Sequence, residues 1–142
     1  MTARSAPPGH TAVFRTGFLY FLIIFAFAFV LGVARGLLIA PRLGEAIAVI
    51  LEIPVLLIAS CLVSRRLVHD GSFNLPQLCS IGAIAFVLTI VSEAGLAGAI
   101  RGQSLAQWLA ALATPIGMVG LAGQIGFAMM PVFIGASSTK KA

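Results

Sequence analysis

Charged side chains are scarce in this chain of 142 residues. They make up 9% of the composition, whereas soluble domains carry about a quarter. Hydrophobic residues account for 60%, and the mean hydropathy is +1.09. This composition excludes a water-soluble domain and predicts an integral membrane protein built as one domain. The net charge of +5 does not indicate nucleic-acid binding, because the basic residues form short clusters at helix ends without interleaved aromatic residues.

Residues that build metal, haem and redox sites are equally rare. The two histidines, His10 and His69, both lie in polar segments, so no histidine pair is placed to ligate haem between apolar helices. The spacing of Cys61 and Cys79 indicates no metal site. Both cysteines fall near predicted cytoplasmic helix ends, where a disulfide is not expected.

Motifs of catalysis are also missing. The sequence contains no phosphate-binding glycine loop and no nucleophile–base pair. We therefore predict no catalytic residue, no metal and no cofactor, and expect only bound lipid. A membrane enzyme acting on a lipid-like substrate stays open as a hypothesis, with an accessible Glu45 as its acid–base group, but no motif favours it.

Four apolar runs are long enough to cross a bilayer, which takes about 20 residues. The predicted transmembrane domain covers 17–135, with helices at 17–40, 44–64, 76–100 and 115–135. Pro41 is expected to end the first helix, because it cannot continue the hydrogen-bond ladder. A very short loop follows, and Asp70-Gly71 marks a turn before the third helix. The sequence predicts an all-α, integral membrane four-helix bundle made of two antiparallel hairpins.

Three segments flank or interrupt these helices. Residues 1–16 are predicted to be a polar N-terminal segment, because Pro7-Pro8-Gly9 opposes helix formation, and residues 136–142 form a basic tail. Between them, Ser104 can cap a short segment at 104–113 that contains Trp108. Because tryptophan prefers the membrane interface, this segment is either a separate interfacial helix or an extension of the fourth span.

The distribution of charge orients the bundle. With four spans, six basic residues and one acidic residue lie on one side and account for the whole net charge of +5. These residues are Arg4, Arg15, Arg65, Arg66, Lys140, Lys141 and Asp70. The positive-inside rule therefore predicts that both termini are cytoplasmic. The opposite half holds three arginines and three glutamates, so its charge is balanced.

Five polar residues form the candidate site, either for a ligand or proton or for a structural ion pair: Arg35, Glu45, Glu52, Glu93 and Gln124. Helical rise places all of them except Glu45 about 9 to 13 Å in from the outer end, one on each helix. Intramembrane charges usually pair with one another, so Arg35 could bind Glu52 or Glu45, with Glu93 held by Arg101 or protonated. A pocket or relay for protons, cations or a polar ligand, or contact with a charge on another protein, are the alternatives.

Two stripes of side chains receive simpler interpretations. Phe18, Phe21, Phe25 and Phe29 recur at helical spacing, which is typical of a face that contacts lipid or another helix rather than a pigment or quinone. The fourth helix carries glycines at 117, 120, 123 and 126. Such small residues predict a close-packing surface, with oligomerisation as one use.

The first hairpin contains the run R-x5-P-R-x-G-E-x6-E-x-P, made by Arg35, Pro41, Arg42, Gly44, Glu45, Glu52 and Pro54. It resembles a run found in small four-helix bacterial inner-membrane proteins of unassigned activity. The resemblance covers about residues 30–65, with a looser likeness at 101–108. It implies a bacterial inner-membrane location and no particular reaction, ligand or partner.

Two functional hypotheses follow. The first is a non-enzymatic accessory or scaffold subunit of a larger membrane complex, suggested by the absence of soluble domains and catalytic groups. Its partners would be the lipid bilayer and either other subunits or further copies of itself. The second is a small transporter or channel for protons or cations that uses Glu52 and Glu93.

Overall fold

The computed structural model describes residues 8–68 and 72–139, and within them it contains helices and no strands. The long helices are α1 (His10–Ala34), α3 (Glu45–Val68), α4 (Leu75–Arg101) and α6 (Pro115–Thr139). Two short helices, α2 (Ala40–Leu43) and α5 (Leu105–Leu112), and a π-helical turn, η1 (Arg35–Ile39), complete the fold. Four helical stretches are long and apolar enough to cross a membrane: His10–Leu43, Glu45–Val68, Leu75–Arg101 and Pro115–Ser137. The predicted all-α class with four such helices is therefore confirmed.

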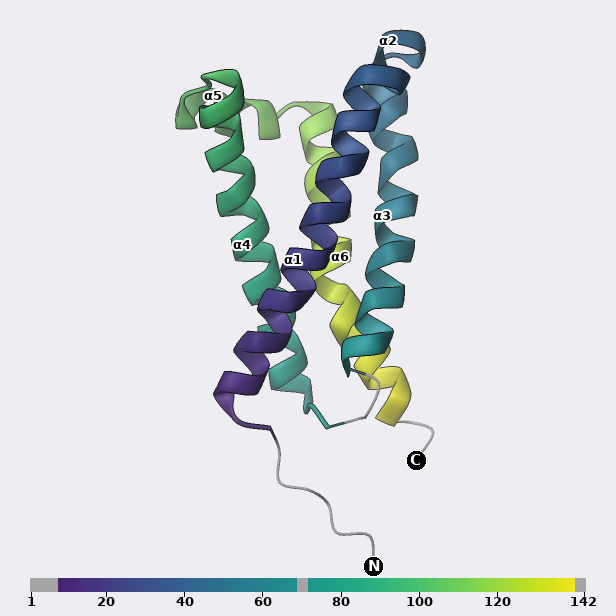
Figure 1. Cartoon of the computed structure of the whole chain (residues 1–142), viewed down its shortest axis with the longest axis vertical. Helices are drawn as coiled ribbons and strands as arrows, with labels where there is room; N and C mark the ends of the chain where they lie inside the picture. The colour runs from purple at the N-terminus through teal and green to yellow at the C-terminus, as the bar shows by residue number, and fades with distance from the viewer. Residues whose placement is uncertain (1–7, 69–71, 140–142) are drawn as a thin grey trace, which may run out of the picture.

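The long helices form one bundle in which α6 packs on both α3 and α4, and α1 packs mainly on α4. Figure 1 shows α1 crossing the bundle diagonally, beside α4 near its start and beside α3 near its end. The starts of α1 and α4 and the ends of α3 and α6 lie at one end of the bundle, and α2 and α5 lie at the other (Figure 1). Below, these are called the terminal end and the hairpin end.

The first helix begins at His10, earlier than the predicted start at residue 17. The carbonyl of Gly9 accepts hydrogen bonds from the amides of Ala12 and Val13, at 3.0 and 3.3 Å. Val13 is buried in a cluster with side chains of α3 and α4, and Gln77 of α4 donates to the carbonyl of Pro8 at 2.7 Å. Packing against α4 thus extends the helix beyond its apolar run. Arg4, His69, the Asp70-Gly71 turn, Lys140 and Lys141 lie outside the described residues.

Pro41 does not end this helix, contrary to the prediction. A proline lacks an N–H and its ring clashes with the carbonyl four residues earlier. The π turn before Pro41, in which the amide of Ala40 bonds to the carbonyl of Arg35, inserts one extra residue and absorbs this misfit. Gly44 ends the helix instead, with a φ of 84° that glycine adopts without steric cost.

The half of the bundle toward the terminal end has a filled core. Tyr20, Phe21 and Ile24 of α1 pack there against Ala85 of α4 and Phe127 of α6. The rings of Tyr20 and Phe127 stack with centroids 4.8 Å apart. Helices α4 and α6 approach so closely that a Cβ at Gly82 would overlap the carbonyl group of Ala128. This tight packing closes one half of the bundle.

Candidate functional site

A cavity of about 590 Å³ occupies the half of the bundle toward the hairpin end. All four long helices and α5 contribute to its lining, and Ile24 and Phe127 separate it from the filled core beyond. Its volume falls within the range of about 300 to 1,000 Å³ that is usual for small-molecule sites. All five residues of the predicted site, Arg35, Glu45, Glu52, Glu93 and Gln124, line this one cavity.

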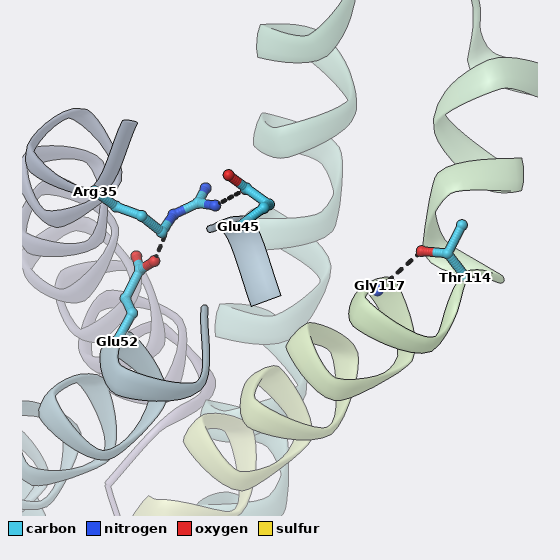
Figure 2. Close-up of polar contacts among 5 residues, drawn as sticks. All are labelled: Arg35, Glu45, Glu52, Thr114 and Gly117. Atoms are coloured by element: carbon cyan, nitrogen blue, oxygen red, sulfur yellow. Dashed lines mark hydrogen bonds and ion pairs between the residues drawn. The ribbon is translucent and has the colours of Figure 1, made fainter. Parts of the chain in front are cut away.

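Arg35 lies between two glutamates (Figure 2). Its Nε is 2.8 Å from Oε2 of Glu52 in an ion pair, and its Nη1 donates a hydrogen bond to Glu45. The Nε–H is not aligned for a hydrogen bond with a described residue, so its contact with Glu52 is mainly electrostatic. Exposed fractions of 26% for Arg35 and 16% for Glu52 place this pair at the wall of the cavity. The arrangement connects η1 to α3 through the charge of Arg35.

Glu93 of α4 has a different partner. The side-chain amide of Gln124 on α6 donates to both carboxylate oxygens of Glu93, each at 2.7 Å. Among the described residues Glu93 forms no ion pair within 4 Å, so the alternative in which Arg101 holds Glu93 by a direct contact is not seen. Arg101 is exposed at the edge of the same cavity. The Oε1 atom of Gln124 is buried and accepts no hydrogen bond within the described part of the chain.

Aromatic side chains from three helices form part of the apolar wall, beside a larger number of aliphatic side chains. The aromatic residues are Phe25 and Phe29 of α1, Trp108 of α5 and Phe127 of α6. The predicted phenylalanine stripe therefore divides, because Phe18 is exposed and Phe21 lies in the filled core. The sequence did not indicate this wall, since its members come from separate helices and share no spacing.

Helix α5 is held against the start of α6 at the hairpin end. The hydroxyl of Thr114 accepts a hydrogen bond from the amide of Gly117 at 3.1 Å (Figure 2) and donates to the carbonyl of Ala111 at 2.7 Å. A Cβ at Gly117 would come within 2.8 Å of the backbone of Leu112, so only glycine allows this approach. Trp108, at 7% exposure, is thereby fixed in the cavity wall.

Tyr20 was not predicted from the sequence to have a particular role. Its hydroxyl donates to the carbonyl of Phe127 at 2.7 Å. In a regular helix that carbonyl would accept from the amide of residue 131, which here is Pro131 and has no N–H. Tyr20 supplies the missing donor from another helix. A proline inside the fourth apolar run was the available sequence signal, because the carbonyl four residues before it needs a partner.

These features define the class: an all-α protein with four helices that could span a membrane and a cavity between them lined by ionisable and aromatic side chains. Comparisons with protein-family models, with curated proteins and with solved structures found no match to this chain. Function is therefore inferred from the site itself.

Proposed function

We propose that this protein is a small multi-pass membrane carrier that moves a proton or a cation, with Glu93 as the binding group. One observation carries the proposal: Glu93 lines a cavity of about 590 Å³ and forms no ion pair among the described residues. A carboxylate removed from water is costly unless it is paired. Glu93 can be satisfied by a proton or by a cation that enters the cavity, and intramembrane carboxylates often serve in such pathways.

The balance of charge around the cavity supports a cationic substrate. Its ionisable lining consists of two arginines, Arg35 and Arg101, and three glutamates, Glu45, Glu52 and Glu93. With all five ionised, the lining has one negative charge in excess. Because Arg35 already contacts Glu45 and Glu52, a monovalent cation at Glu93 would neutralise the set.

A carrier fits the bundle better than a continuous channel. The cavity lies toward the hairpin end, while the half toward the terminal end is filled by the cluster around Tyr20 and Phe127. A pore would require a passage through that cluster. Carriers bind their substrate between packed helices and expose the site to one side at a time, and a cavity in one half of the bundle suits one such state.

A bacterial inner membrane, with both termini in the cytoplasm, is the proposed setting. The resemblance of the first hairpin to small inner-membrane proteins supports the location. The basic residues Arg65 and Arg66 lie in the last turn of α3, at the terminal end of the bundle, and the positive-inside rule assigns such an end to the cytoplasm. The cavity would then face the opposite side of the membrane.

The role of an accessory or scaffold subunit is the second hypothesis, and its support is weaker. The glycine-rich face that suggested an interface is partly used within the chain. A Cβ at Gly123 would contact Ile53, and one at Gly126 would contact Leu57, both on α3. Purification in mild detergent that yields this chain with a second protein in fixed stoichiometry would favour this role over that of a carrier.

Transport assays in proteoliposomes test the carrier proposal. The full chain should dissipate an imposed pH gradient, or take up a cation, faster than empty vesicles, as measured with an entrapped pH indicator and a panel of radiolabelled inorganic cations and organic amines. Glu93→Gln should lower this rate at least tenfold, because the amide can neither release a proton nor balance a cation.

Val91→Ala is the matched control for that variant. Val91 lies two residues away on α4 and is 63% exposed, so its truncation should leave transport intact. The carrier proposal fails if Glu93→Gln, once shown to be folded, transports at the wild-type rate. It also fails if the wild-type chain is no faster than empty vesicles with protons and with every cation of the panel.

A further inference from the structure

We propose that the substrate is a protonated amine with an apolar, preferably aromatic, body, and that its ammonium group binds between Glu93 and Gln124. This inference rests on the carrier function proposed above and names the class of cation that the cavity accepts. It follows from the size of the cavity, the chemistry of its walls and one unpartnered oxygen atom.

The size of the cavity argues against a bare ion. A volume of about 590 Å³ is that of a site for an organic molecule, far more than a proton or a single metal ion requires. No three histidine, cysteine, aspartate or glutamate side chains among the described residues gather as metal ligands. The space around Glu93 therefore suits a cation that carries a body of its own.

The side chains that line the cavity indicate the chemical character of the rest of this cation. Phe25, Phe29, Trp108 and Phe127 line the cavity together with aliphatic side chains. Aromatic faces attract cations and also pack against apolar groups. A small hydrophilic cation would leave these surfaces unused, whereas an amine with an aryl or alkyl body would cover them while its charge reached Glu93.

The orientation of Gln124 favours an amine that still carries N–H groups. Its amide donates to both oxygens of Glu93 at 2.7 Å, which leaves the buried Oε1 atom without a partner among the described residues. An unsatisfied buried acceptor is unfavourable. An ammonium group can donate one N–H to Glu93 and, once the side chain of Gln124 rotates to turn the enclosed Oε1 toward the cavity, another to this oxygen, whereas a quaternary ammonium supplies charge alone.

Trp108 makes binding directly measurable. It is the only tryptophan in the chain and it lies in the wall of the cavity, so its fluorescence should change when a ligand enters. The probes are four molecules with the same apolar body and different heads: phenylbutylamine, phenylbutyltrimethylammonium, phenylbutanol and phenylbutyrate. They are titrated near neutral pH into the purified full chain in detergent.

We expect saturable binding of phenylbutylamine. Phenylbutanol and phenylbutyrate should bind at least tenfold more weakly, because they lack the positive charge. The trimethylammonium compound should be intermediate, because it keeps the charge but cannot donate to Gln124. The four probes partition differently into detergent micelles, so affinities are calculated from the free concentration of each probe, measured by equilibrium dialysis.

Two variants test whether Glu93 and Gln124 bind the ammonium group. Glu93→Gln should weaken phenylbutylamine binding at least tenfold and abolish the preference for the amine over the alcohol. Gln124→Leu should reduce the preference for the amine over its trimethylammonium counterpart. Ile125→Ala is the control, since Ile125 is the next residue on α6, is 52% exposed and does not line the cavity.

Circular dichroism and gel filtration establish that each variant is folded. If one is not, the probe series on the wild-type chain still decides.

The outcomes separate this inference from the function on which it rests. If phenylbutanol or phenylbutyrate binds as tightly as the amine, or the amine does not bind, the substrate class is wrong. If transport of protons or inorganic cations still depends on Glu93, the carrier proposal survives that result. If Glu93-dependent transport is also absent, both proposals fail.

Discussion

Arg35 and Glu93 line the same cavity but differ in whether a residue of opposite charge contacts them. Arg35 has two carboxylate partners within its own hairpin, so its charge is satisfied by the fold. In the part of the chain that the structure describes, the hydrogen-bond partner of Glu93 is neutral, the amide of Gln124. The ion pair made by Arg35 is therefore best read as a structural contact between η1 and α3, and Glu93 as the group left available for a ligand.

Tyr20 shows how one side chain can satisfy the backbone of another helix. Its hydroxyl group replaces the N–H that Pro131 lacks. Tyr20 and Phe127 are buried, at 1% and 5% exposure, so loss of the hydroxyl would leave the carbonyl of Phe127 without this donor. This hydrogen bond is therefore expected to contribute more to the free energy of unfolding than a hydrogen bond between exposed side chains.

A double-mutant cycle tests this account. Tyr20→Phe should lower the free energy of unfolding by about 1–3 kcal/mol, the usual range for leaving a buried acceptor unpaired. In the background of Pro131→Ala the same change should have a smaller effect, because residue 131 then provides an N–H to the carbonyl of Phe127. Thermal unfolding of the four proteins in one detergent measures the coupling, and equal effects of Tyr20→Phe in both backgrounds would contradict the explanation.

At the scale of the elements, glycine has three distinct uses. Gly44 ends the first hairpin's outgoing helix with a positive φ. Gly82 allows α4 to lie against the carbonyl of Ala128, and Gly117 allows α5 to fold onto the start of α6. The last two allow close contacts between helices, one in the filled half of the bundle and one beside the cavity.

Gly82→Ala should be strongly destabilising. Its methyl group would overlap backbone atoms of α6, which cannot move as a flexible side chain can, and overpacking of this kind costs about 1–3 kcal/mol or more. Gly95→Ala on the same helix is the matched control, because nothing lies within 4 Å of the position of the added Cβ. That substitution should raise stability by up to about 1 kcal/mol through helix propensity. Unfolding midpoints that move in the same direction for both variants would refute the proposed contact between α4 and α6.

At the scale of the whole molecule, the two ends of the bundle differ in charge. Arg65 and Arg66 lie at the terminal end, whereas the cavity at the hairpin end has arginines and glutamates in near balance. This difference gives the proposed membrane orientation and also the side from which a substrate would reach Glu93.

Reporter fusions measure that orientation. A green fluorescent protein attached after residue 142 should fluoresce, since it would fold in the cytoplasm. Alkaline phosphatase inserted after Gln103, between α4 and α5, should be active, since it would lie outside. The physical reason is the attraction of basic loops to the cytoplasmic side. The opposite pattern of the two reporters would invert the bundle and place the cavity on the cytoplasmic face.

The sequence predicted the positions of the helices better than the contacts between side chains of different helices. Long apolar runs determine the number of spans, and helical rise placed Arg35, Glu52, Glu93 and Gln124 at one level, where they line one cavity. It did not predict that Glu93 meets Gln124 rather than Arg101, nor the aromatic wall. Such contacts depend on the rotation of each helix about its axis, which small residues and backbone irregularities set and which periodicity does not reveal.

The π turn at Arg35–Ile39 has a consequence for how this site can vary. One residue more or less in a helix changes the direction of every later side chain by about 100°. Deletion of Gly36 would remove the extra residue that accommodates Pro41, and it would turn Arg35 relative to α2 and α3 and away from Glu45 and Glu52. The ion pair thus depends on the rotation of the helix about its axis as well as on the charged residues. Related chains without the inserted residue would need their acidic partners at other positions.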